Sequence, residues 1–191
     1  GYQSVRNAKI IPDFFKRENL GTDIYIMGYH AENGWEEKLI KSVLHNFWLA
    51  IMHGDLEVSI KNGAVKNISQ KNLEKFLDEY DAEDAKFYYN SVTNWTRKFE
   101  KELSHLGKVS LFVRKGEEYP SKIMMARKPK MVVQEKQYRV LREPYAGVFL
   151  CDDDRGNSLL KDLEPPKHDE WDKYRSKIGA VALGELNSWI K

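Results

Sequence analysis

Residues 35–53, with the sequence WEEKLIKSVLHNFWLAIMH, set the architecture that this chain adopts. Their apolar residues recur at three- and four-residue spacing, which is the period of an amphipathic α-helix. These residues are Ile40, Val43, Leu44, Phe47, Trp48 and Ile51. Gly54 follows where a helix C-cap is expected. Because so wide an apolar stripe has to be buried, we expect this helix to pack against a sheet.

The residues that follow predict both strands and helices. Residues 56–60 alternate strictly between apolar and polar, and Asn62-Gly63 is a strong hairpin signal that leads into a return strand. Helical spacing begins again at Ser69 and once more over residues 82–96.

The second half of the chain predicts further strands and a closing helix. Residues 109–113 alternate as a strand, and a turn over residues 117–120 leads to a paired strand at Ile123 and Met125. An extended segment at 131–133 and a buried strand at 145–150 follow, and residues 152–157 are expected to form a solvated turn. Residues 171–190 predict a helix whose apolar face carries Tyr174, Ile178, Val181, Ala182 and Trp189.

This order of elements predicts an α+β fold with a mixed or antiparallel sheet and helices packed mainly on one face. The 191 residues are 41% hydrophobic and 31% charged, which is an ordinary globular composition. No apolar run approaches the ~18 residues of a membrane span, and no signal peptide is recognisable. The single cysteine, Cys151, excludes an intramolecular disulfide and a cysteine-based zinc site. We therefore expect a cytoplasmic protein with no membrane partner.

Charge is distributed unevenly along the second half. Residues 114–142 contain nine basic and three acidic residues, a net charge of +6, whereas residues 152–172 contain eight acidic and three basic residues, a net charge of −5. A basic hairpin could bind the phosphates of a nucleotide or of a nucleic acid. The other interpretation is that the two stretches form solvated surfaces that neutralise one another across the fold.

No catalytic or metal-binding motif accompanies this charge. A calcium loop counted from Asp152 fails, because Gly156 falls at position five and Leu163 at position twelve. The run His168-Asp169-Glu170 is better placed to begin the last helix than to bind an ion. The serine-hydrolase, Walker and dinucleotide motifs have no counterpart in the sequence. The sequence therefore predicts no catalytic residue and no metal site.

Three short segments carry a resemblance to a known family. Residues 21–26, GTDIYI, resemble the closing strand of the gyrase/Hsp90/MutL (GHKL) ATPase lobe. Residues 145–149, YAGVF, and 163–171, LEPPKHDEW, look like late segments of bacterial ATP-binding proteins of this group. The resemblance implies that residues 1–30 are the C-terminal remnant of an upstream ATPase lobe. Residues 31–191 would then form a transducer-like domain with a fold similar to ribosomal S5 domain 2.

Departures from the family limit what the resemblance implies. Asn46 lies in the helix, but no Asp-Ala follows it, and the Asp-x-Gly-x-Gly adenine loop and the glycine-rich lid are missing. We therefore expect ATP and magnesium to belong to a longer protein that extends upstream, and the chain alone to be inactive. The upstream lobe is the expected partner, and a homodimer is a further one.

The transducer of this family carries a lysine that reaches the γ-phosphate, where it couples chemistry to motion. Lys128 and Lys130 are the candidates for this contact, with Lys122 behind them. The remaining basic residues of the stretch would form a basic surface: Arg114, Lys115, Arg127, Lys136, Arg139 and Arg142.

Two alternatives stay open beside the coupling function. One is a nucleic-acid-binding module that uses the basic stretch, with Tyr119 and Tyr138 available for stacking on bases. The other is a protein-interaction domain with no site of its own.

Overall fold

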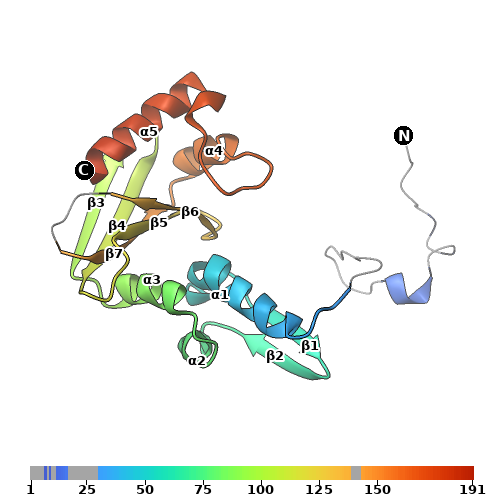
Figure 1. Ribbon diagram of the computed structural model, residues 1–191. Coiled ribbons are helices and arrows are strands. Elements are labelled where there is room, and N and C mark those ends of the chain that lie inside the picture. Colours follow the sequence, from blue (N-terminus) through green and yellow to red (C-terminus); the bar gives the residue numbers. More distant parts are fainter. Residues whose placement is uncertain (1–6, 8, 10–11, 17–29, 139–142) are drawn as a thin grey trace. The chain divides into compact units, whose positions relative to one another are not determined.

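A computed structural model describes residues 7, 9, 12–16, 30–138 and 143–191 (Figure 1). The chain divides into two units, residues 1–33 and 34–191. In the first unit the described residues include one short 3-10 helix, Asp13–Phe15. The segment 21–26, which resembles the closing strand of the ATPase lobe, lies outside the described residues, as do Arg139 and Arg142.

The second unit begins with the elements that the sequence predicts. The long amphipathic helix is confirmed, its buried side including Ile40, Leu44, Trp48 and Ile51, and the hairpin turns at Gly63, which has a positive φ of 73°. Two shorter helices follow. The elements are α1 (Trp35–Met52), β1 (Val58–Asn62), β2 (Ala64–Ile68), α2 (Leu73–Glu79) and α3 (Glu83–Thr93).

A five-stranded mixed sheet forms the centre of this unit, which confirms the predicted α+β class. Its strands are β3 (Arg97–Leu103), β4 (Gly107–Lys115), β5 (Lys122–Arg127), β6 (Val132–Gln137) and β7 (Tyr145–Cys151). They lie in the order β3-β4-β7-β5-β6. The strand β5 runs parallel to β7, and the other neighbours are antiparallel. The strand β5 therefore pairs with β7 and β6 and not with β4, although β4 directly precedes it in the sequence.

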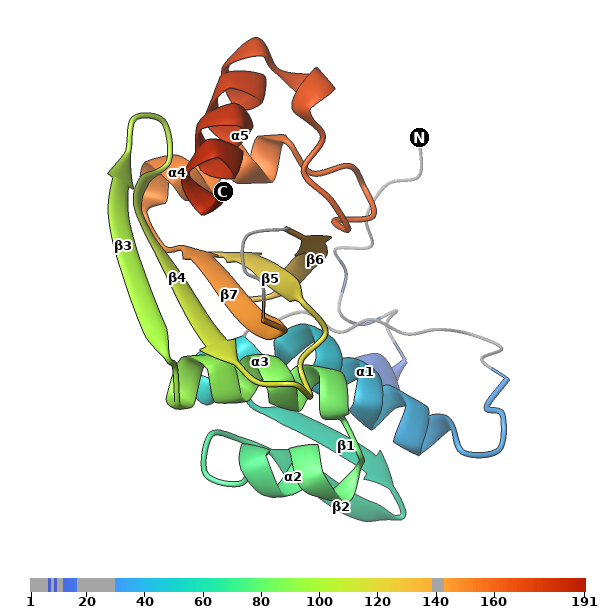
Figure 2. The same ribbon diagram turned by 60° about the vertical axis from the view of Figure 1, so that its left-hand side comes forward.

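Helices cover both faces of the sheet, where the sequence predicts mainly one (Figure 2). One core is formed by one face of the sheet with α1 and α3 and extends to α2 and the hairpin β1–β2, and the other lies between the opposite face and α4 (Asp154–Asp162) and α5 (Lys177–Ile190). The reason is the composition of the inner strands: β5 is buried at every position except Lys122, and β7 at every position except Leu150. A strand that is apolar on both sides needs a cover on both faces.

Two predictions about the C-terminal region are wrong. Residues 152–157 do not form a solvated turn, because the Asp153 carboxylate accepts from the backbone N–H groups of Arg155 and Gly156 and so starts α4. The last helix begins at Lys177, where Ser176 is the N-cap. His168-Asp169-Glu170 therefore lies in a loop that precedes this helix.

The buried face of α5 also differs from the predicted one. Ala182 is buried and Trp189 is partly buried, but Tyr174, Ile178 and Val181 are exposed. The side that contacts the sheet carries Gly179, Leu183, Leu186 and Ile190 instead. None of the described helices combines the length and the apolar composition that a bilayer crossing requires.

Candidate functional site

The turn that joins β5 to β6, residues 127–130, is here called the basic turn. The backbone N–H of Lys130 donates to the carbonyl oxygen of Arg127 at 2.6 Å, and Lys130 adopts a left-handed φ of 58°. The three basic side chains of this tight turn contact three different carboxylates.

Arg127 forms the buried base of the turn. Its Nε donates to Oε1 of Glu164 at 2.5 Å, and its second terminal nitrogen donates to Oε2 of the same carboxylate at 2.7 Å. The remaining terminal nitrogen donates to Oδ1 of Asn157 at 3.1 Å. Such a two-pronged contact between a guanidinium and a carboxylate fixes both position and orientation. The Arg127 side chain is therefore held in place by its contacts with Glu164 and Asn157.

Glu164 gathers further donors from its own loop. The Trp171 Nε1–H donates to Oε1 at 3.2 Å, and Nδ1 of His168 lies 2.8 Å from Oε2. Burial by itself raises the pKa of Glu164, but the hydrogen bonds from Arg127, His168 and Trp171 outweigh it, so the pKa lies below its ordinary value of 4.5. The carboxylate is thus charged at neutral pH, and it ties the loop of residues 164–171 to the end of β5.

Lys128 and Lys130 reach in two other directions. Lys128 Nζ pairs with Oδ1 of Asp154, the first residue of α4, and Lys130 Nζ pairs with Oδ2 of Asp55, in the connection between α1 and β1. These two carboxylates belong to the opposite helical layers of the sheet. The hydrogen bond with Asp154 raises the pKa of Lys128, and the hydrogen bond with Lys130 lowers the pKa of Asp55.

Lys128 and the two aspartates are more open to solvent than the arginine pair, whereas Lys130 is largely buried. The side chains of Lys128 and Asp154 are 47% and 85% exposed, and those of Lys130 and Asp55 are 13% and 50% exposed. In contrast, the Glu164 side chain is 0% exposed. Ion pairs exposed to water contribute little to stability, about 0–1 kcal/mol each. Lys128 can therefore exchange its carboxylate for another anion at small cost. Lys130 is itself largely buried, so its exchange requires the half-exposed Asp55 to turn away into water.

The structure does not bring Lys122 to this site. It lies at the opposite end of β5 from the basic turn, and its Nζ pairs with Oε2 of Glu135 across the hairpin at 3.1 Å. Five residue steps along the strand take the chain from Lys122 to Arg127, a distance of about 16 Å.

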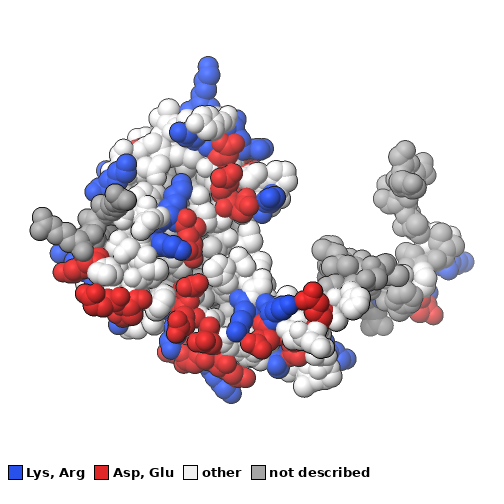
Figure 3. Space-filling model, in the orientation of Figure 1, with Lys and Arg blue, Asp and Glu red and all other residues white. Residues whose placement is uncertain are grey.

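The other predicted basic residues are dispersed and mostly paired. Arg114 donates to the Asn94 carbonyl at 2.8 Å, and Lys115 lies 3.0 Å from Glu143. Lys136 is half-buried, and burial lowers its pKa. Figure 3 shows basic and acidic side chains interspersed on the face in view, with no continuous basic patch.

The two tyrosines expected to stack on bases are not available for it. Tyr119 is buried beside Phe87, with ring centroids 5.4 Å apart, and Tyr138 is buried with its hydroxyl donating to Asn187. That expectation is wrong, because both rings belong to the folded core.

Sequence reasoning missed the acidic half of the site. The expected turn over residues 152–157 contains Asp154, and neither Glu164 nor Asp55 is among the predicted site residues. Asp154 lies 26 residues and Asp55 75 residues from its lysine along the chain. Only the excess of acids over residues 152–172, set against the basic stretch, hinted at such pairs.

Among the described residues no group of three His, Cys, Asp or Glu side chains could hold a metal ion. The arrangement at the basic turn suits anion recognition, since it offers two neighbouring ammonium groups on a rigid base. No protein-family model, curated protein or solved structure matches the chain.

Proposed function

We propose that this chain couples nucleotide binding in an upstream GHKL-type lobe to a conformational change, with the basic turn as its phosphate sensor. The observation that carries the proposal is the arrangement of Lys128 and Lys130. They lie two residues apart in one turn, yet they hold carboxylates from opposite helical layers of the sheet.

Competition between anions supplies the mechanism. A terminal phosphate carries more charge than a carboxylate and offers several acceptor oxygens, so it binds ammonium groups strongly. When it reaches the turn, Lys128 leaves Asp154 and Lys130 leaves Asp55, while the buried Arg127 stays with Glu164. The turn keeps its place in the sheet, and α4 and the α1–β1 connection each lose a tether. The basic turn therefore holds both helical layers when no phosphate is bound and releases them when phosphate is bound.

The whole protein would supply the parts that the chain lacks. ATP, magnesium and the catalytic residues belong to the upstream lobe, which is the expected partner in the cytoplasm. Reading the coding sequence upstream of residue 1 tests this assignment. We expect Glu-x-x-x-Asn and Asp-x-Gly-x-Gly motifs there, and a reading frame without them would refute membership of the GHKL family.

The sensor itself can be tested on the 191-residue chain. Inorganic triphosphate is titrated in, and amide shifts are followed by nuclear magnetic resonance. We expect saturable shifts at Lys128, Lys130, Asp55 and Asp154, and their loss in the variant Lys128→Gln/Lys130→Gln. The matched control is Lys122→Gln, which removes an equally paired lysine from the other end of β5. Equal losses in both variants would show that the chain attracts triphosphate only through its general charge.

The nucleic-acid alternative makes a different prediction, namely binding that weakens steeply as salt is raised. No contact among the described residues favours it, because the basic side chains resolved in the stretch 114–142 are mostly paired within the fold. Steeply salt-dependent binding of an oligonucleotide to the chain would replace the coupling proposal. No binding of triphosphate or oligonucleotide would leave the protein-interaction domain as the better description.

A further inference from the structure

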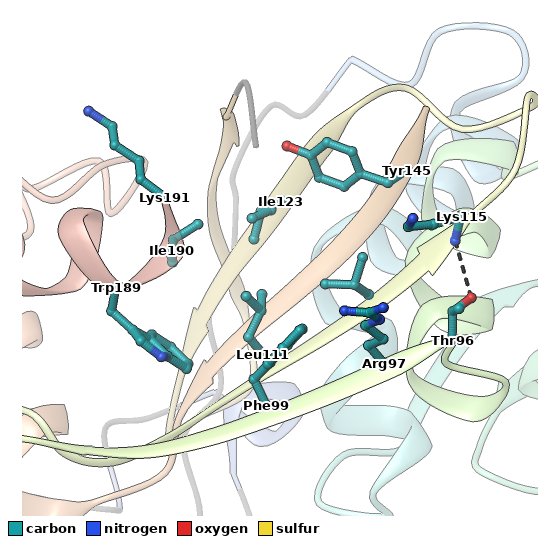
Figure 4. A pocket seen from close by; sticks show the side chains of 11 residues that line it. Thr96, Arg97, Phe99, Leu111, Lys115, Ile123, Tyr145, Trp189, Ile190 and Lys191 are labelled. Atoms are coloured by element: carbon teal, nitrogen blue, oxygen red, sulfur yellow. Dashed lines mark hydrogen bonds between the residues drawn. The ribbon is translucent and has the colours of Figure 1, made fainter. Parts of the chain in front are cut away.

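A second site lies on the same sheet, at the opposite end of β5 from the basic turn. It is a cleft of about 240 Å³ between the strands β3 and β4 and the C-terminal end of α5 (Figure 4). It is independent of the proposed coupling function, because it shares no residue with the basic turn.

The walls of this cleft are apolar. Phe99, Leu111 and Ile123 form the floor on the sheet, and Trp189 and Ile190 close the side that belongs to α5 (Figure 4). The Trp189 ring is held edge-on to Phe149, with centroids 6.5 Å apart, so it forms a fixed wall. Phe99 remains 43% exposed although it faces this core. An apolar surface of this kind, concave and uncovered, is typical of a ligand site.

Among the described residues, the charged side chains that line the cleft are all basic. They are Arg97, Lys115 and Lys191. The Lys191 side chain points away in Figure 4, and Lys115 is paired with Glu143. Arg97 is exposed, with no ion pair among the residues that the structure describes, and its guanidinium lies beside the floor residues (Figure 4). The cleft therefore offers one uncommitted cation at the edge of an apolar pocket.

Size and charge together define the ligand. A dry engineered cavity of about 150 Å³ accepts benzene, so a volume of 240 Å³ has room for a larger ring system. A guanidinium at the rim selects a carboxylate or sulfonate and also stacks on aromatic planes. We propose that this cleft binds a small aromatic anion, with a body of one or two rings and a single acidic group.

Calorimetric titration of the chain with 1-naphthoate tests the proposal, with neutral 1-naphthalenemethanol as the comparison ligand. The variant Arg97→Gln removes the rim charge from an exposed position. The variant Lys98→Gln is its matched control, since it removes the neighbouring charge from the same strand, on the side that faces Phe112 and the other core. The Trp189 indole signal reports whether the ligand occupies the cleft.

We expect 1-naphthoate to bind and to shift the Trp189 indole signal, with a Kd that rises about tenfold in Arg97→Gln and stays unchanged in Lys98→Gln. The neutral ligand should bind equally to all three proteins. The proposal is overturned by an absence of saturable 1-naphthoate binding at ~1 mM, by equal losses in the two variants, or by a Trp189 signal that does not move at saturation.

Discussion

At the scale of single residues, Arg127 and Glu164 form a buried ion pair. Its two charges are buried together, and removing one partner of such a pair leaves the other uncompensated, at a cost of about 3–5 kcal/mol. We expect Arg127→Met to lower the free energy of unfolding by about this amount in urea denaturation. The double variant Arg127→Met/Glu164→Leu should recover much of the loss, because it buries no lone charge. A double variant as unstable as the single one would contradict this account.

The same carboxylate predicts a dependence of stability on pH. The folded state holds the pKa of Glu164 below its ordinary value of 4.5, so the unfolded chain binds this proton at a higher pH than the folded chain does. The contribution to stability is therefore complete above the unfolded pKa and is lost as the pH falls through the folded one. Unfolding free energies measured from pH 7 down to pH 3 should decline in this acid range. The decline should be shallower in Glu164→Gln, and an unchanged slope there would assign it to other carboxylates.

At the scale of elements, two helical glycines are expected to respond in opposite ways to substitution by alanine. In α4, a Cβ on Gly156 would lie 2.1 Å from the Leu106 carbonyl oxygen and 2.5 Å from Cys151 Sγ, whereas a Cβ on Gly184 in α5 meets nothing within 4 Å. Gly156→Ala should therefore destabilise the protein by about 1–3 kcal/mol, as overpacking does. Gly184→Ala should stabilise it by up to about 1 kcal/mol, as helix propensity predicts. Thermal unfolding of both variants measures whether each substitution raises or lowers stability. A stabilised Gly156→Ala would show that α4 does not pack against Leu106 and Cys151 as closely as described.

The close approach at Gly156 also explains why the sequence did not predict α4. An Asp-rich run that ends in Gly-Asn has the composition of a turn, and only the contact with Leu106 shows that the glycine serves packing. The strand β3 was missed for a similar reason. Its residues are exposed from Arg97 to Glu102, so no alternation marks it, and its pairing with β4 alone makes it a strand.

Elements with a strong period of their own were predictable, and those defined by distant neighbours were not. The helix α1 and the hairpin β1–β2 follow from spacing and from Asn62-Gly63, which are local signals. The face of α5 depends on which side the sheet presents, and the sequence favoured Ile178 and Val181, which are exposed. The candidate site divides in the same way. The density of charge identified Lys128 and Lys130, but their partners come from elements that only the fold brings near.

At the scale of the whole molecule, β7 is where the two cores meet. It lies at the centre of the sheet, between β4 and β5, with Val148 in one core and Phe149 in the other. Exposure of this strand therefore requires both helical layers and both neighbouring strands to separate. Local opening at an edge, such as β3 or β6, would leave it covered. The strand is thus a natural reporter of global unfolding.

Cys151, the last residue of β7, makes this measurable. Its side chain is buried beside the Leu106 carbonyl, and burial raises the pKa of the thiol to about 12, so the reactive thiolate is suppressed in the folded state. We expect iodoacetamide at pH 8 to label the native chain only through global unfolding. The labelling rate should rise with urea in parallel with the unfolding equilibrium, and Gly184→Ala should slow it in proportion to its gain in stability. A rate that is independent of urea would reveal a local opening at the end of β7, and the two cores would then not unfold as one unit.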